Sequence, residues 1–92
     1  MDERHKWSIT DNIIAFYLCK YSTSEINYTY NEIANKLGMT TDKLKMRGAN
    51  FKSLMEAGKG LADVSEQTSK VFACFRDLDG NEFRELVIKL LA

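Results

Sequence analysis

The 92-residue sequence contains no proline and only one histidine and one tryptophan. It has no apolar run of about 18 residues, so it predicts no membrane-spanning helix. The charged start, MDERHKW, lacks the apolar core of a secretory signal. Cys19 and Cys74 do not form a CxxC pair, and each lies among apolar neighbours. We therefore expect a cytoplasmic protein in which both thiols are reduced and buried.

The chain also lacks net charge, because 13 Lys and Arg residues balance 13 Asp and Glu residues. Phosphate contacts dominate DNA affinity, so zero net charge alone weakens a nucleic-acid function. The charges are nevertheless segregated. Residues 36–59 hold six basic and two acidic residues, a net charge of +4, whereas residues 1–35 and 60–92 carry −2 each. Such a basic patch can orient a neutral protein on an anionic surface.

Apolar residues make up 45% of the chain, which is enough for a hydrophobic core. The length suits one domain spanning residues 1–92. Apolar residues recur at helical spacing almost throughout, and strict alternation is absent. The sequence thus predicts an all-α fold of about five helices with no sheet of consequence. The expected core residues include Leu37, Leu44, Phe51, Phe72 and Leu86.

Helix-capping residues divide the chain into these helices. The first helix is expected to begin near Ser8 or Thr10, the fourth at Ser65 and the fifth, NEFRELVIKLLA, at Asp79. A loop, GKGLADVS, separates the third helix from the fourth and has room for a short wing-like turn. In the fifth helix, Ile88 lies off the main apolar stripe. That position suits either a helix end tucked between two others or a two-fold dimer through this helix.

The clearest local signals lie in the second helix and the turn that follows it. Thr29 and Glu32 have the spacing of a capping box. Gly38 supplies the left-handed residue that ends a helix. Thr40 or Thr41 then caps a third helix. In the middle of that helix, Gly48 costs about 1 kcal/mol relative to alanine, so we expect another helix to cross closely there.

A helix, a glycine, a short turn and a second helix form the pattern of a helix-turn-helix. The second helix of such a motif enters the major groove of DNA. Threonine and asparagine can reach base edges, lysine and arginine can bind phosphate, and arginine can also bind guanine. The free amides at the helix start can bind a phosphate. The predicted contacts with double-stranded DNA are Thr40, Thr41, Lys43, Lys45, Arg47, Asn50 and Lys52.

The run NEIANKLGMTTDKLKMRGANFKSL resembles the helical domain that precedes the nuclease module in many HNH endonucleases. In those proteins a similar helix-turn-helix ends in an asparagine–phenylalanine pair, here Asn50 and Phe51, often followed by a leucine, here Leu54. The Trp7-Ser8 start and the GKGLADVS stretch are also similar, so the likeness covers most of the chain. The resemblance implies a DNA-contacting accessory domain. Its motifs are mostly packing residues, so it assigns no individual DNA contact.

The sequence departs from that family because His5 is its only histidine, so the His–Asn–His metal site is absent. We expect either a stand-alone relative or the N-terminal part of a longer protein, with no enzyme activity and no cofactor. DLDGN is better explained by a turn and a helix cap than by a calcium loop. A protein-interaction module, such as a phage-encoded inhibitor built on a helix-turn-helix scaffold, remains the alternative to a DNA-binding regulator. Adhesive residues such as Tyr28, Tyr30 and Met46 would suit that alternative if they are exposed.

Overall fold

A computed structural model describes residues 7–57 and 65–92 of the chain. These residues form five α-helices, and no strand occurs among them. The predicted all-α fold is thereby confirmed. The wing-like turn expected within GKGLADVS and the histidine His5 lie outside the described residues. The helices are α1 Ile9–Tyr21, α2 Tyr30–Leu37, α3 Thr41–Ala57, α4 Glu66–Phe75 and α5 Gly80–Leu91.

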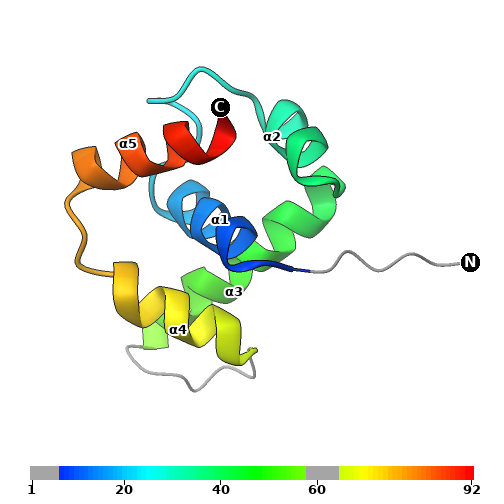
Figure 1. Ribbon diagram of the computed structural model, residues 1–92. Helices are drawn as coiled ribbons and strands as arrows, with labels where there is room; N and C mark the ends of the chain where they lie inside the picture. Colours follow the sequence, from blue (N-terminus) through cyan, green and yellow to red (C-terminus); the bar gives the residue numbers. More distant parts are fainter. Residues whose placement is uncertain (1–6, 58–64) are drawn as a thin grey trace, which may run out of the picture.

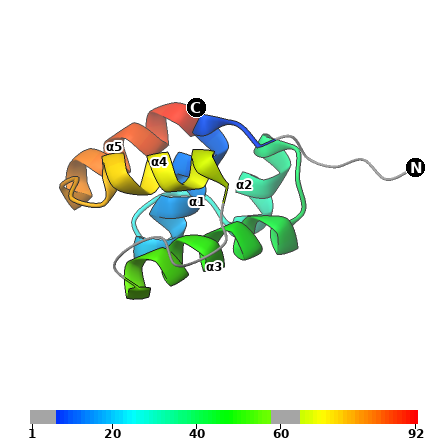
Figure 2. The same ribbon diagram turned by 90° about the horizontal axis from the view of Figure 1, so that it is seen from below.

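Helix α1 lies at the centre of the molecule, and the other helices surround it (Figure 1). Every residue from Asp11 to Leu18 is buried, so the helix is covered on all sides. A helix covered all round belongs in the middle of a bundle rather than at its surface. Helix α1 packs against α3, α4 and α5. In a second view, α3 and α5 lie on opposite sides of α1 (Figure 2).

The predicted caps account for how the first two helices begin and end. Helix α1 begins at Ser8, whose Oγ accepts from the Asp11 amide at 3.0 Å while the Asp11 carboxylate accepts from the Ser8 amide at 3.1 Å. Thr10 is therefore the wrong one of the two predicted caps, because only Ser8 has an acidic partner three residues on. In α2, the Thr29–Glu32 capping box is confirmed. Gly38 ends that helix with a φ of 76°, as predicted.

The remaining helices also begin at predicted capping residues. Thr40, rather than Thr41, begins α3, since its Oγ1 accepts from the Lys43 amide at 3.2 Å. Ser65 Oγ accepts from the Thr68 amide at 3.1 Å at the start of α4. The Asp79 carboxylate accepts from the first amides of α5, at 3.0 and 3.2 Å. The cap at Asp79 accounts for the acidic residue before Gly80 in the DLDGN turn.

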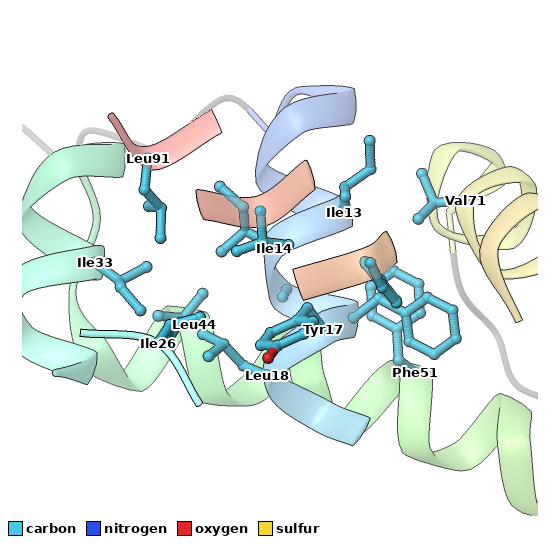
Figure 3. Packing of buried hydrophobic residues seen from close by; sticks show 14 of the residues in the cluster. Ile13, Ile14, Tyr17, Leu18, Ile26, Ile33, Leu44, Phe51, Val71 and Leu91 are labelled. Carbon is cyan, nitrogen blue, oxygen red and sulfur yellow. The ribbon is translucent and has the colours of Figure 1, made fainter. Parts of the chain in front are cut away.

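The core is continuous from Ile33 and Leu91 at one end to Phe51 and Val71 at the other (Figure 3). Aromatic rings fill its middle. Phe16 of α1 stacks on Phe51 of α3, with ring centroids 4.7 Å apart and an interplanar angle of 11°. The rings of Phe72 and Phe83 lie 5.6 and 5.8 Å from Phe16. Three helices are thus joined to α1 through one ring.

Two of the expected core leucines are only partly buried. Leu37 is the last residue of the two-turn helix α2, whose buried positions are Ile33 and Ala34. Leu86 flanks the buried stripe of α5, which consists of Phe83, Val87 and Leu91 at a spacing of four. A helix with one neighbour buries only the residues facing it. The other three expected core residues, Leu44, Phe51 and Phe72, are buried as predicted.

The prediction of two buried thiols is wrong. Cys19 is half-buried, whereas Cys74 is exposed. Helix α4 turns Val71 and Phe72 toward the core. Cys74 follows Phe72 by two residues, which is about 200° around the helix and therefore on the opposite side. Apolar neighbours in the sequence do not by themselves bury a helical residue, because adjacent positions face different directions.

Helix α3 crosses α1 at Gly48, as the sequence predicts. A Cβ built on Gly48 would lie 3.9 Å from the carbonyl oxygen of Ala15 and 4.0 Å from the Cβ of Cys19. These are ordinary van der Waals distances. The two helices therefore cross at Gly48 with room for a methyl group, so the crossing does not require glycine at this position.

Candidate nucleic-acid interface

The segment joining α2 to α3 is a tight, well-bonded turn. The Gly38 amide donates to the carbonyl oxygen of Asn35 at 3.2 Å, and the Met39 amide donates to that of Ala34 at 3.0 Å. The Met39 side chain is buried with a relative exposure of 9%. Carbonyl groups at the end of α2 are thereby satisfied, as a left-handed glycine cap requires. The turn fixes the direction in which α3 leaves α2.

Helix α3 lies along one edge of the molecule, so one of its faces meets solvent along its length (Figure 2). Of the seven predicted DNA contacts, Thr40, Lys45, Asn50 and Lys52 are exposed. Thr41, Lys43 and Arg47 are partly buried. Helix α3 also carries two exposed acidic residues, Asp42 and Glu56, and the exposed Met46. The outer side of α3 is therefore mixed in charge, with lysines in excess.

The lysines of α2 and α3 have no carboxylate partner within the described residues. The ion pairs found there are Lys70–Glu66 in α4 and Arg84–Glu85 in α5. Lys45 instead places its Nζ 5.3 Å from the ring centroid of Tyr30. Lys36 places its Nζ 5.5 Å from that of Tyr28. We define the basic face by the exposed lysines of these two helices: Lys36, Lys45 and Lys52. Lys43 is partly buried and lies about 160° around α3 from Lys45, so it does not belong to this face.

Arg47 does not belong to this face. One of its guanidinium nitrogens, Nη1, donates to Asn12 Oδ1 at 2.8 Å and to Thr68 Oγ1 at 2.7 Å. The guanidinium carbon lies 4.0 Å from the ring centroid of Trp7. Burial lowers the pKa of Arg47, and the nearby Asp11 charge raises it by a smaller amount. Arg47 is one of the predicted DNA contacts, yet its guanidinium is directed toward α1 and α4 rather than toward solvent alone.

The helical spacing of Arg47 predicts an inward-facing position, although its charge favours an exposed one. Arg47 follows Leu44 by three residues and precedes Phe51 by four, so it continues their buried stripe. Its partners Asn12 and Thr68 are both fully buried, at 0% exposure. Neither polar residue was expected at the core. Their burial is what allows a charged side chain to occupy a core-facing position.

A hollow of about 260 Å³ lies where α1, α2 and α3 meet, beside the basic face. Its side-chain lining includes Leu18, Cys19, Tyr30, Leu44, Lys45 and Lys52. Burial raises the pKa of the Cys19 thiol, and the positive charges of Lys52 and Lys20 oppose this shift. A protonated thiol is a weak nucleophile. Within residues 7–57 and 65–92 no cluster of three His, Cys, Asp or Glu side chains could hold a metal ion.

Comparisons with protein families, curated proteins and solved structures gave no match for this chain. The resemblance to the N-terminal domain of HNH endonucleases accordingly stays a prediction. No helix within the described residues has the length and apolar character needed to span a membrane. The function is therefore inferred from the charge and exposure of the basic face.

Proposed function

We propose that the protein binds double-stranded DNA through the basic face, with α3 lying in the major groove. The observation that carries this proposal is the set of three exposed lysines, Lys36, Lys45 and Lys52, for which the described residues provide no carboxylate partner. A cation already paired with a carboxylate loses that partner when it binds phosphate. These lysines lose none, so each phosphate contact keeps its full gain from counterion release.

Two of the other predicted contacts are also exposed and therefore accessible to DNA. The threonine that begins α3, Thr40, is exposed, and so is Asn50 three turns farther along. Asparagine can make two hydrogen bonds with adenine in the major groove. Lys36 lies in α2, where the first helix of a helix-turn-helix passes the phosphate backbone. The sequence resemblance to a DNA-contacting domain agrees with this partner.

One observation favours the alternative, a protein-interaction module. Met46 is 68% exposed, in the middle of the outer side of α3. Methionine is flexible and polarizable, and it is enriched in protein–protein interfaces. The exposed acidic residues Asp42 and Glu56 flank it along the helix and would repel phosphate. On this reading α3 would grip a protein partner, and the lysines would serve only to orient the encounter.

Fluorescence anisotropy with a random duplex at two salt concentrations tests the proposal. The wild-type protein should bind less tightly at the higher concentration. Lys45→Ala combined with Lys52→Ala should weaken binding and reduce the slope of log affinity against log salt by about 2, or about 1 for each phosphate contact. The matched control combines Lys70→Ala with Lys89→Ala, two exposed lysines on α4 and α5. The control pair should leave the slope unchanged.

The two candidate functions give different results in this experiment. A folded wild-type protein that does not bind the duplex at low salt would exclude DNA binding and leave the protein-interaction module. If the α3 double variant and the control double variant lose the same affinity, the duplex is attracted by positively charged residues in general and not by the basic face. Circular dichroism of each variant establishes that it is folded before its affinity is interpreted.

A further inference from the structure

The proposed function uses the outer side of α3, whereas the strongest polar cluster in the described residues lies on its inner side. From this cluster we infer that Arg47 is a positioning residue, which sets how α3 is presented to DNA without contacting phosphate itself. The inference rests on the proposed function and adds a residue to it. It also reverses the sequence prediction for Arg47, which counted this side chain among the DNA contacts.

Arg47 joins three segments that are distant in the sequence. Its Nη1 contacts Asn12 in α1 at 2.8 Å and Thr68 in α4 at 2.7 Å. Asn12 in turn donates to Gln67 Oε1 at 2.7 Å, and Thr68 Oγ1 lies 3.3 Å from Asn12 Oδ1. No buried side-chain nitrogen or oxygen of the described residues lacks a hydrogen-bond partner. A fully satisfied polar network of this kind specifies one arrangement of the helices it joins.

The ring of Trp7 covers the guanidinium on a further side, at 4.0 Å. The planar, delocalised guanidinium can stack on an indole while its edge donates hydrogen bonds. A lysine ammonium has no such plane, so it cannot make the stack and the paired hydrogen bonds in the same way. The segment before α1 therefore helps to hold the middle of α3. Arginine, rather than positive charge in general, is what the cluster requires.

Arg47 is also turned away from the basic face. At 3.6 residues per turn, Lys45 lies about 160° and Lys52 about 140° around α3 from Arg47. Lys45 and Lys52 are exposed, whereas Arg47 is partly buried. The guanidinium and these two lysines consequently lie on different sides of one helix. Arg47 can influence DNA binding through the position of α3, because its Nη1 is already bonded to α1 and α4.

Salt dependence separates a positioning residue from a phosphate contact. We expect Arg47→Met to reduce duplex affinity roughly 2- to 30-fold at fixed salt, the range for residues that act through a network. The slope of log affinity against log salt should stay at the wild-type value, because no phosphate contact is lost. Arg47→Lys should lose a similar amount of duplex affinity, because a lysine keeps the charge but cannot restore the stack on Trp7 and the paired hydrogen bonds. Lys45→Met is the matched control and should reduce the slope by about 1.

Trp7, the only tryptophan of the chain, supplies a readout that needs no DNA. Its emission should change in Arg47→Met and Arg47→Lys and stay the same in Lys45→Met. If Arg47→Met does not fold, Trp7→Ala replaces it in the binding assay, because it removes the stack and leaves both hydrogen bonds. That variant should bind the duplex more weakly with an unchanged salt slope.

Two results would overturn the inference. One is a salt slope reduced by about 1 in Arg47→Met together with near wild-type affinity in Arg47→Lys, which is the behaviour of a phosphate contact. The other is unchanged Trp7 emission in both Arg47 variants, which would mean that the cluster does not hold the N-terminal segment. Failure of the wild-type protein to bind any duplex refutes the proposed function and the DNA role of Arg47. The emission measurement still decides whether Arg47 anchors α3.

Discussion

Replacing each of two glycines by alanine should change the stability of the protein in opposite directions. At Gly48, in the middle of α3, the new Cβ would meet only ordinary contacts, 3.9 Å from the Ala15 carbonyl oxygen and 4.0 Å from the Cβ of Cys19. Alanine is favoured over glycine in a helix interior by about 1 kcal/mol. Gly48→Ala should therefore raise the free energy of unfolding by roughly 0.5–1 kcal/mol.

Gly38 has room for a side chain but not the backbone conformation for one. Nothing lies within 4 Å of a Cβ built there, yet its φ is +76°. In the left-handed region the Cβ of an L-residue approaches the following carbonyl oxygen, which costs about 1–2 kcal/mol. Gly38→Ala should lower the free energy of unfolding by this amount. Because no neighbour is displaced, the whole effect belongs to the backbone.

Urea unfolding followed by circular dichroism measures both effects on one scale. With a slope of about 1–3 kcal/mol per molar urea, the midpoints of the two variants should differ by roughly 1 M. A loss of more than about 1 kcal/mol in Gly48→Ala would refute the packing described for α1 and α3, because it requires a closer approach than ordinary contact. A Gly38→Ala variant as stable as the wild type would show that α2 does not end in a left-handed residue.

Four further outcomes follow from burial. Phe51→Ala should cost roughly 3–5 kcal/mol of unfolding free energy, and a loss below about 1 kcal/mol would contradict the stacked Phe16 contact. A thiol reagent should label the exposed Cys74 before Cys19. Because burial raises the pKa of Cys19, the unfolded chain releases that proton first, so stability should fall as pH rises through the alkaline range. Ile88, 36% exposed on α5, separates the two accounts of that helix by sedimentation equilibrium. A dimer that Ile88→Lys converts to a folded monomer would support the two-fold dimer, whereas a constant single-chain mass would exclude it.

The helix boundaries could be predicted because each cap joins residues that are close in the sequence. Thr29 and Glu32 bond to each other's amides across three residues, so the sequence contains both partners of the interaction. Ser65 and Asp79 likewise bond to amides two or three residues ahead. Such interactions form whatever surrounds the helix. Local chemistry therefore suffices to place the helix starts.

Burial was predictable only where a residue lies on the central line of a helix. Phe51 and Leu44 lie on that line and are buried. Leu86 flanks it, and its exposure depends on how many neighbours α5 has. The number of neighbouring helices follows from the tertiary arrangement, which apolar spacing does not contain. For the same reason, apolar neighbours in the sequence did not predict the exposure of Cys74.

The candidate site shows the same division between local and distant interactions. The exposed positions of Lys45 and Lys52 follow from the period of α3 alone. The inward position of Arg47 follows from that period too, but a charged side chain is ordinarily expected to be exposed to solvent. Its inward position is stabilised by two buried hydrogen-bond acceptors, Asn12 and Thr68, which lie 35 and 21 residues away in the sequence. A buried charge can be anticipated only when its partners are known.

The zero net charge of the chain is compatible with a DNA-binding face because part of the negative charge, on α5, lies far from α3. Helices α3 and α5 lie on opposite sides of α1 (Figure 2). With packed helix axes about 8–10 Å apart, the acidic residues of α5 are roughly 16–20 Å from the axis of α3. At physiological ionic strength the Debye length is about 8 Å, so that distance spans about two screening lengths. A phosphate beside Lys45 or Lys52 therefore experiences the lysines much more strongly than Glu82 or Glu85. The total charge sums over both sides, whereas binding depends on the side that meets the DNA.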